Sequence, residues 1–275
     1  MRERICFFAH TCPMAHYGKK LFSLIILLIF AIVLLALFPQ CAFAEEEGEK
    51  MASYTTAYSA SFAARAHNIE LAASLLDGQK VGAGAEFSFN AAVGARTSER
   101  GFESAKVILN GEYVDGVGGG VCQVSSTLYN AWVLAGLAVR SVRAHSLPSG
   151  YVPMSQDATV SEYIDLVLLN DSPSEVTIRA AAREGKLTIA LLGKRKKVKV
   201  TLTPEVLAVV PAGEDIEYVD ELPAGKDMVI ARKPRQGYRT RLLATYVYED
   251  GRSEKKELRR DFYRPTDVKI LMIAD

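Results

Sequence analysis

The chain has 275 residues, of which 49% are apolar and 24% charged, which suits a globular protein of one or two domains and excludes disorder over most of its length. Its 33 Lys and Arg residues nearly balance 32 Asp and Glu residues, and the formal net charge is +1. No overall positive field is therefore available to hold a nucleic acid, and four unevenly placed cysteines do not make a disulfide scaffold.

Residues 21–38 form an uncharged apolar run that two lysines precede and three glutamates follow. This is the charge pattern of a chain whose remainder is exported. Ala42-Phe43-Ala44 fits a signal-peptidase site, but eighteen apolar residues approach the length that spans a bilayer. Residues 1–44 are therefore predicted to be a cleaved signal peptide or an N-terminal membrane anchor. Cys41 is not predicted to carry a lipid, because the residues before it are not small.

Loss of residues 1–44 removes four basic side chains and one acidic one, so the formal charge falls from +1 to −2. It also leaves one cysteine, Cys122, and two histidines, His67 and His145. An unpaired thiol in an exported chain is a candidate reactive group. Residues 45–53 are acidic and small and are predicted to be a linker.

Three patterns predict the elements of the next region. Apolar residues at spacings of three and four predict a helix over residues 61–76, which ends at Asp77-Gly78. Alternation predicts a strand over residues 86–90, and Asn110-Gly111 predicts the turn of a hairpin. After a glycine run, helical spacing resumes over residues 121–135.

The rest of the chain is predicted to be β. Apolar runs separated by turn signals indicate strands over residues 164–169, 176–180, 187–192, 206–210, 228–231, 241–248 and 257–263. The fold class is therefore α+β, with mixed helices and antiparallel strands over residues 54–198. No helix is predicted after about residue 199, so residues 199–275 are predicted to form a small all-β domain.

The motif GVGGGVCQVSST places Cys122 between a glycine-rich loop and the start of a helix. The positive end of the helix dipole and free backbone N–H groups lower the pKa of a thiol at this place. The same N–H groups can hold an oxyanion, so Gly118, Gly119, Gly120 and Gln123 are predicted to form the oxyanion loop.

A thiol nucleophile is commonly paired with a base. His145, which follows a predicted strand, is favoured over His67, and either Asp157 or Asp165 is left to orient it. A lone cysteine is also often a small buried hydrophobe, so a structural Cys122 remains the alternative. No metal site or cofactor is predicted, because the ligand spacing and the Gly-Lys-Ser/Thr of a phosphate loop are absent from the sequence.

Several motifs between Tyr54 and Leu192 closely resemble the VanW family, whose name comes from an accessory gene of vancomycin-resistance clusters. They are RAHNI (65–69), EFSFN (86–90), VGART (93–97), GGGVCQVSSTLYN (118–130), HS (145–146) and DATV (157–160). The resemblance implies an exported or membrane-anchored protein. It also implies a cysteine L,D-transpeptidase of peptidoglycan, the activity attributed to some members, with Cys122 as nucleophile.

Catalytic roles under this reading go to Cys122, His145 and Asp157, and the expected partner is a peptidoglycan stem peptide or another wall polymer. Arg96 and Arg100 are predicted to pair with stem carboxylates, because a guanidinium binds a carboxylate bidentately. Ser125 is predicted to contact the substrate with them. The alternative is a non-enzymatic module that binds wall polymer or a partner.

Two stretches depart from the family pattern: the proline usual before Gly84-Ala85-Glu86 is missing, and Met154-Ser155-Gln156 replaces a proline-glycine-basic run. Both put substrate contacts in doubt more than the fold. The last region, with Pro223-Ala224-Gly225, resembles the small β domains named for five glycines, which are proposed to adhere to carbohydrate.

Overall fold

A four-stranded antiparallel sheet and two long helices form the framework of the first part of the chain in the computed structural model, which describes residues 48–109, 111–194, 196–223 and 225–273. The helices are α2 (Ala63–Leu76), α3 (Phe89–Val93) and α4 (Val121–Leu134). The strands up to residue 193 are β1 (Glu49–Ala57), β2 (Lys80–Val81), β3 (Glu86–Ser88), β4 (Ser104–Leu109), β5 (Glu112–Val117), β6 (Ala138–Ser141), β7 (Val167–Leu169), β8 (Val176–Arg183) and β9 (Lys186–Gly193).

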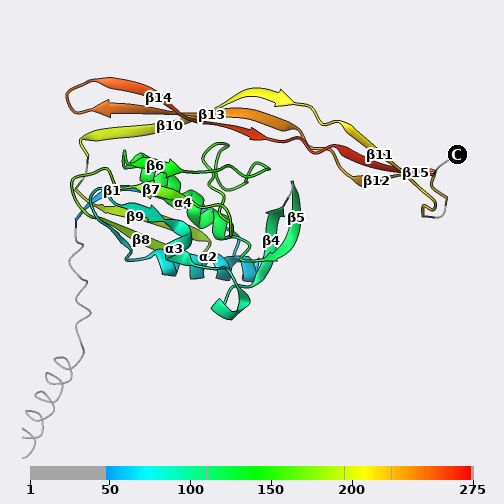
Figure 1. Ribbon diagram of the computed structural model, residues 1–275, viewed down its shortest axis with the longest axis horizontal. Helices are drawn as coiled ribbons and strands as arrows, with labels where there is room; N and C mark the ends of the chain where they lie inside the picture. Colours follow the sequence, from blue (N-terminus) through cyan, green and yellow to red (C-terminus); the bar gives the residue numbers. More distant parts are fainter. Residues whose placement is uncertain (1–47, 110, 195, 224, 274–275) are drawn as a thin grey trace, which may run out of the picture. The chain divides into compact units, whose positions relative to one another are not determined.

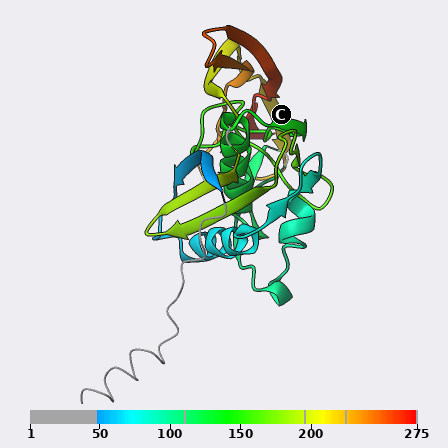
Figure 2. The same ribbon diagram turned by 90° about the vertical axis from the view of Figure 1, so that its left-hand side faces the viewer.

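The main sheet has the order β1-β9-β8-β2, and α2 and α4 pack against it and against each other (Figures 1 and 2). α4 contacts β1 and β9, whereas α2 contacts β8 and β9. A smaller sheet has the order β3-β7-β6, and β4 and β5 form the predicted hairpin. The helices over residues 61–76 and 121–135 and the strands at 176–180 and 187–192 are thus confirmed, with shifted ends.

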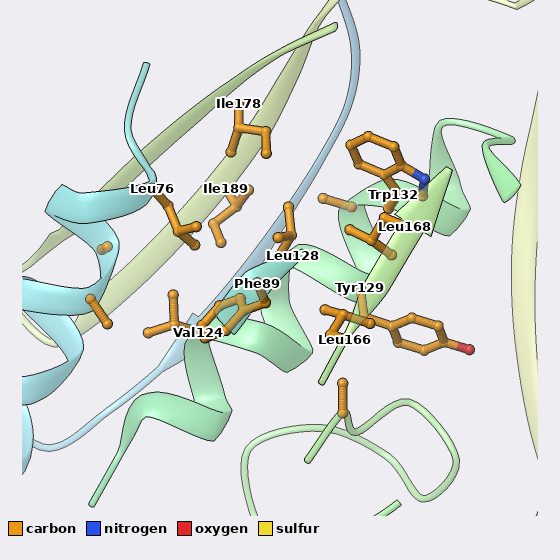
Figure 3. Close-up of a cluster of buried hydrophobic side chains, with 14 of the residues drawn as sticks. Leu76, Phe89, Val124, Leu128, Tyr129, Trp132, Leu166, Leu168, Ile178 and Ile189 are labelled. Carbon is orange, nitrogen blue, oxygen red and sulfur yellow. The ribbon is translucent and has the colours of Figure 1, made fainter. Parts of the chain in front are cut away.

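The hydrophobic core lies between the helices and the main sheet. Figure 3 shows side chains from both long helices, α3, β7, β8 and β9, and Leu166 just before β7, meeting there: Leu76, Phe89, Val124, Leu128, Tyr129, Trp132, Leu166, Leu168, Ile178 and Ile189. Each of these side chains is at most 1% exposed. α4 supplies the most of them because nearly every one of its residues is buried, polar ones included. A helix buried on all sides is held rigidly, which suits it to carry functional groups at its end.

Two further three-stranded sheets follow residue 198. The first has the order β10-β13-β14, from β10 (Val198–Val210), β13 (Gly237–Tyr248) and β14 (Ser253–Tyr263). The second has the order β11-β15-β12, from β11 (Glu214–Val219), β12 (Met228–Arg232) and β15 (Val268–Ile273), with β11 and β15 parallel. As predicted, no helix lies in the described residues of this region. The strands β11 and β15 were not predicted.

The first of these sheets shares the core of the preceding region. Leu242 on β13 is fully buried and belongs to the same hydrophobic cluster as α4, and Leu202 and Leu258 pack against it. Residues 47–275 form a single compact unit by their contacts. The boundary between residues 198 and 199 stays a prediction.

The structure corrects two local predictions. Residues 49–53, predicted to belong to a linker, lie in β1, which pairs with β9 and buries Met51. The strand over 86–90 ends at Ser88, because the Ser88 hydroxyl accepts a hydrogen bond from the Ala91 amide and caps α3. An edge strand with polar outward side chains and a one-turn helix give weak periodic signals.

The predicted leader, residues 1–44 with the apolar run 21–38, lies outside the described residues, and so does Cys41. Within the described ranges, no helix has the length and apolar character needed to cross a bilayer.

Truncating the core side chain of α4 tests this packing. Leu128→Ala removes a fully buried side chain and is expected to lower the free energy of unfolding by about 3 kcal/mol in a urea titration. The control is Leu207→Ala on β10, whose side chain is 45% exposed and whose loss is expected to cost under about 0.5 kcal/mol. Equal losses in the two variants would contradict the packing described.

Candidate active site

Two kinds of steric constraint shape the glycine loop before α4. Gly118 and Gly120 have φ angles of +85° and +110°, a region that favours glycine. A Cβ on Gly119 would lie 2.7 Å from the carbonyl carbon of Ala105, so the loop lies directly against β4. Only glycine fits at all three positions, and the result is that Cys122 stands as the second residue of α4.

Asn68 of α2 fixes this loop from the opposite side. Its amide nitrogen donates to the carbonyl oxygens of Glu103 (2.9 Å) and Gly119 (3.0 Å), and its Oδ1 accepts from the Glu103 amide at 2.8 Å. The side chain is fully buried. Asn68 therefore ties α2, the residue before β4 and the glycine loop together, a role that no sequence pattern indicated.

Cys122, His145 and Asp157 lie together, as predicted. His145 Nδ1 is 2.7 Å from Asp157 Oδ2, which also accepts a hydrogen bond from the His145 amide at 2.7 Å. The other ring nitrogen is thereby left to serve the Cys122 thiol, whose pKa the neighbouring His145 lowers. The thiol itself donates to the Val160 carbonyl oxygen at 3.4 Å and accepts from the Val160 amide at 3.5 Å. The three side chains form a Cys-His-Asp chain of the kind that activates a nucleophile.

The electrostatics of this chain favour a thiolate and an imidazolium. Burial raises the pKa of Cys122, but the hydrogen bond and charge of His145, the Val160 amide and the Arg96 charge outweigh it, and the pKa falls below its usual range. Burial lowers the pKa of His145, but its bonds to Asp157 and Cys122 outweigh it, and that pKa rises. Burial raises the pKa of Asp157, but the His145 contacts and Tyr263 hold it below its usual range.

The first turn of α4 leaves a backbone donor beside the thiol. The amides of Val121 and Gln123 donate to the carbonyls of Gly118 and Gly120, at 3.1 and 2.9 Å. The Cys122 amide makes no such bond with any residue that the structure describes. It is therefore free to donate to an oxyanion formed at a carbonyl that the thiol attacks.

Gln123 does not contribute its side chain to an oxyanion hole. Its Nε2 donates to Thr56 Oγ1 (3.0 Å) and the Ala57 carbonyl (2.8 Å), and its Oε1 accepts from Arg65 Nη2 at 2.8 Å. The residue is 1% exposed. Gln123 instead joins α4 to β1 and holds the Arg65 guanidinium, which the sequence analysis did not single out, at the cleft.

Two predicted substrate contacts are corrected. Ser125 is fully buried, and its hydroxyl donates to the Ala158 carbonyl at 2.6 Å, so it fixes the segment after Asp157 instead of meeting a substrate. Arg100 donates to the carbonyls of Val93 and Ala95 at 2.8 and 2.9 Å and does not line the cleft. Both are polar groups used to satisfy backbone atoms, a use that a motif alone cannot separate from binding.

Arg96 does line the cleft beside Cys122. Its Nη1 donates to Asn90 Oδ1 at 2.9 Å. The backbone amide of Asn90 in turn donates to Asp165 Oδ1 at 2.9 Å. Asp165 therefore anchors Asn90 and α3 and does not orient His145. His67 is exposed, lies 2.8 Å from the Gly101 carbonyl oxygen through Nε2, and is no candidate base for Cys122.

The thiol opens onto a cleft of about 1660 Å³, lined by Cys122, His145 and the loop glycines Gly118 and Gly120. Five buried polar side-chain atoms form no hydrogen bond with described residues, and four of their residues line this cleft: Ser149, Tyr151, Thr159 and Asp261. Buried polar groups are nearly always satisfied, so bound water is expected at these atoms beside the cleft.

Tyr151, one of these four residues, lies against His145, and no sequence pattern indicated it. Its ring packs edge-on against His145, with centroids 6.4 Å apart. Burial, and then the charge of Cys122, raises the pKa of Tyr151, so its hydroxyl stays a neutral donor. No group of three or more His, Cys, Asp or Glu side chains suited to a metal is found within the described ranges.

Residues 64–192 match the family model described as VanW like protein. The chain is 41% identical over 144 residues to the uncharacterized protein YoaR of Bacillus subtilis (strain 168), a match that covers 52% of this chain and 48% of YoaR. It is 31% identical over 111 residues to the vancomycin B-type resistance protein VanW of Enterococcus faecalis (strain ATCC 700802 / V583), a match that covers 38% of this chain and 40% of that protein. The chain thus matches less than half the length of either relative.

Two solved structures are similar to a smaller part of the chain. The IgA1 protease G5 domain structure has a TM-score of 0.21 and 10% identity, over 29% of this chain and 95% of that one. The HP0197-G5 structure has a TM-score of 0.17 and 17% identity, over 27% of this chain and 93% of that one.

Removing the imidazole of His145 tests whether this residue keeps Cys122 as a thiolate. His145→Gln takes away the cation that lowers the pKa of Cys122 and leaves burial, which raises it, so thiolate is lost at neutral pH. Alkylation of Cys122 by iodoacetamide at pH 7, followed on its peptide by mass spectrometry, is expected to slow at least about 10-fold. His67→Gln is the matched control and leaves the rate unchanged. An unchanged rate in His145→Gln would show that the thiol is not activated by this histidine.

Proposed function

We propose that this protein, whose residues 64–192 match the VanW family model, is an exported, wall-associated cysteine acyltransferase of the L,D-transpeptidase type. The observation that carries the proposal is the Cys122-His145-Asp157 chain at the wall of a large cleft. Its substrates would be peptidoglycan stem peptides. A wall location follows from the predicted export leader and from the substrate.

In the first half-reaction, the Cys122 thiolate attacks the carbonyl carbon between the third residue of a stem and its terminal D-residue. The Cys122 amide donates to the oxyanion, and the buried hydroxyl of Tyr151 is suited to donate to it as well. When the C–N bond breaks, the His145 imidazolium gives its proton to the leaving amine, and a thioester remains on Cys122.

In the second half-reaction, the amine of another stem attacks the thioester carbonyl. His145, now neutral, takes the proton of that amine, and the C–S bond breaks to restore the thiolate. Asp157 stays ionised throughout and holds the imidazole in the tautomer whose free nitrogen faces the sulfur. Proton and acyl group therefore balance without a cofactor.

The charge of the cleft suits a substrate that carries carboxylates. Arg65, Arg96, Arg143 and Arg264 all line it. The side chains of Arg65 and Arg96 donate to the neutral side chains of Gln123 and Asn90, and none of the four forms an ion pair with a described residue. Arg143 is joined to the site through its backbone, because its carbonyl accepts from the Thr159 amide at 2.7 Å. Arg96 and Arg143 are therefore the arginines we assign to stem carboxylates, in place of Arg100.

Cys122→Ala, tested on purified muropeptides, decides between this activity and a module that only binds wall polymer. Cross-linking and exchange of the terminal D-residue are expected to disappear, because no other group in the cleft can form the thioester. The matched control replaces Cys6, Cys12 and Cys41 by alanine and is expected to retain activity. Activity that persists in Cys122→Ala, or that the native chain lacks, would refute the mechanism and favour the binding module.

Tyr151→Phe tests the second oxyanion donor. Its loss is expected to lower kcat by about 10- to 100-fold with KM nearly unchanged, because the hydroxyl acts on charge that develops only in the transition state. The alkylation rate of Cys122 should stay close to native, since the thiol and His145 are untouched. Tyr163→Phe, on a side chain that is 89% exposed, is the control. An unchanged kcat would remove Tyr151 from the mechanism.

A further inference from the structure

The carboxylate of Asp157 has its two oxygens held from two parts of the chain. Oδ2 accepts from the His145 amide and faces His145 Nδ1, whereas Oδ1 accepts from the hydroxyl of Tyr263 at 2.5 Å. Tyr263 is the last residue of β14, 106 residues further along the chain, and is fully buried. A group from the C-terminal sheet thus reaches the buried end of the Cys-His-Asp chain.

The direction of this bond is fixed by a second one. The Ser155 amide donates to the same Tyr263 oxygen at 2.7 Å, so that oxygen is the acceptor there. A phenol has one proton, and it is therefore committed to Asp157. Burial, followed by the charge of Asp157, raises the pKa of Tyr263, which keeps the hydroxyl protonated and a donor at any working pH.

Further contacts clamp the same loop to the C-terminal sheet. Ser155 Oγ is 2.7 Å from Thr240 Oγ1 on β13, and Arg259 Nη1 on β14 donates to the Asp157 carbonyl at 2.9 Å. Arg259 Nη2 in turn donates to Asp261 Oδ1 at 2.6 Å. Ser155 has a φ of +64°, where a serine is strained, and such a conformation persists when the surroundings hold it.

We propose that Tyr263 is a positioning residue for the Cys122-His145-Asp157 chain, and that the β10-β13-β14 sheet completes the active site instead of serving only as an appended binding module. Tyr263 keeps the Asp157 carboxylate ionised and turned toward His145 Nδ1. Without it, Oδ1 would be buried without a donor, and the carboxylate would be free to rotate away from the ring. The catalytic consequence rests on the function proposed above, but the positioning of His145 does not.

The test follows the His145 Nδ1 proton in the full chain labelled with ¹⁵N-histidine. The hydrogen-bonded proton is a separate low-field resonance, assigned by its absence in His145→Gln, and it disappears on acidification when Asp157 is protonated. In Tyr263→Phe the carboxylate loses a donor to its charged form, so protonation becomes easier. The midpoint of the loss is expected to rise by about one pH unit, a tenfold change in proton affinity.

Thr240→Val is the matched control. It removes a hydrogen bond between the same two segments, at a residue that is 1% exposed, but does not contact Asp157. It is expected to lower thermal stability and leave the midpoint at its native value. A midpoint that moves equally in Thr240→Val and Tyr263→Phe would mean that Tyr263 only holds the two segments together, and would overturn the proposal.

A fluorinated tyrosine at position 263 gives a second test that does not depend on correct folding of Tyr263→Phe. It keeps the shape and the hydroxyl but is a stronger donor, so the midpoint is expected to move to lower pH. A native midpoint in both Tyr263 replacements would also overturn the proposal. The pH midpoints are measured without turnover, so they separate a failure of the positioning proposal from a failure of the proposed acyl transfer. If acyl transfer occurs, Tyr263→Phe is expected to lower kcat several-fold with KM unchanged.

Discussion

The site depends on one buried negative charge. Asp157 is 1% exposed, and a carboxylate at such a place is tolerated only when hydrogen bonds replace its water. His145 supplies two contacts and Tyr263 a third. Because these donors come from the loop that follows β6 and from β14, satisfying the carboxylate also fixes how the C-terminal sheet meets the site. The charge that activates His145 is therefore a constraint on the fold.

A second constraint is the close approach of the glycine loop to β4. Gly119 leaves no room for a Cβ, and Gly118 and Gly120 take φ angles that other residues disfavour. Any side chain there would move the first turn of α4, which carries the thiol and its free amide. Since α4 is buried along its whole length, that turn has little freedom to adjust. Asn68 closes the arrangement from α2.

Local signals in the sequence were enough to locate half of this site. The glycine run and helical spacing placed Cys122 at a helix start, and its place after a predicted strand favoured His145 over His67. The choice between Asp157 and Asp165 needed the fold, because both follow His145 in the chain and neither has a distinctive spacing from it. Tyr263 and Arg259 lie about a hundred residues from Asp157, and no periodicity reports contacts at that range.

One of the two departures from the family pattern is explained in the same terms. Ser155 stands where the resemblance led us to expect a glycine, and its φ of +64° shows what the glycine would be for. Here Thr240 and Tyr263 hold the serine instead, so the departure affects the clamp on Asp157 and not a substrate contact.

A cysteine that merely fills a core is surrounded by apolar atoms. The Cys122 thiol instead meets an imidazole, the backbone amide and carbonyl of Val160 and the charge of Arg96, beside a cleft lined by four of the five described residues with unsatisfied buried polar atoms. A fold that served stability alone would have satisfied those atoms and avoided a strained serine. Their concentration around one thiol is the physical argument for the function proposed above.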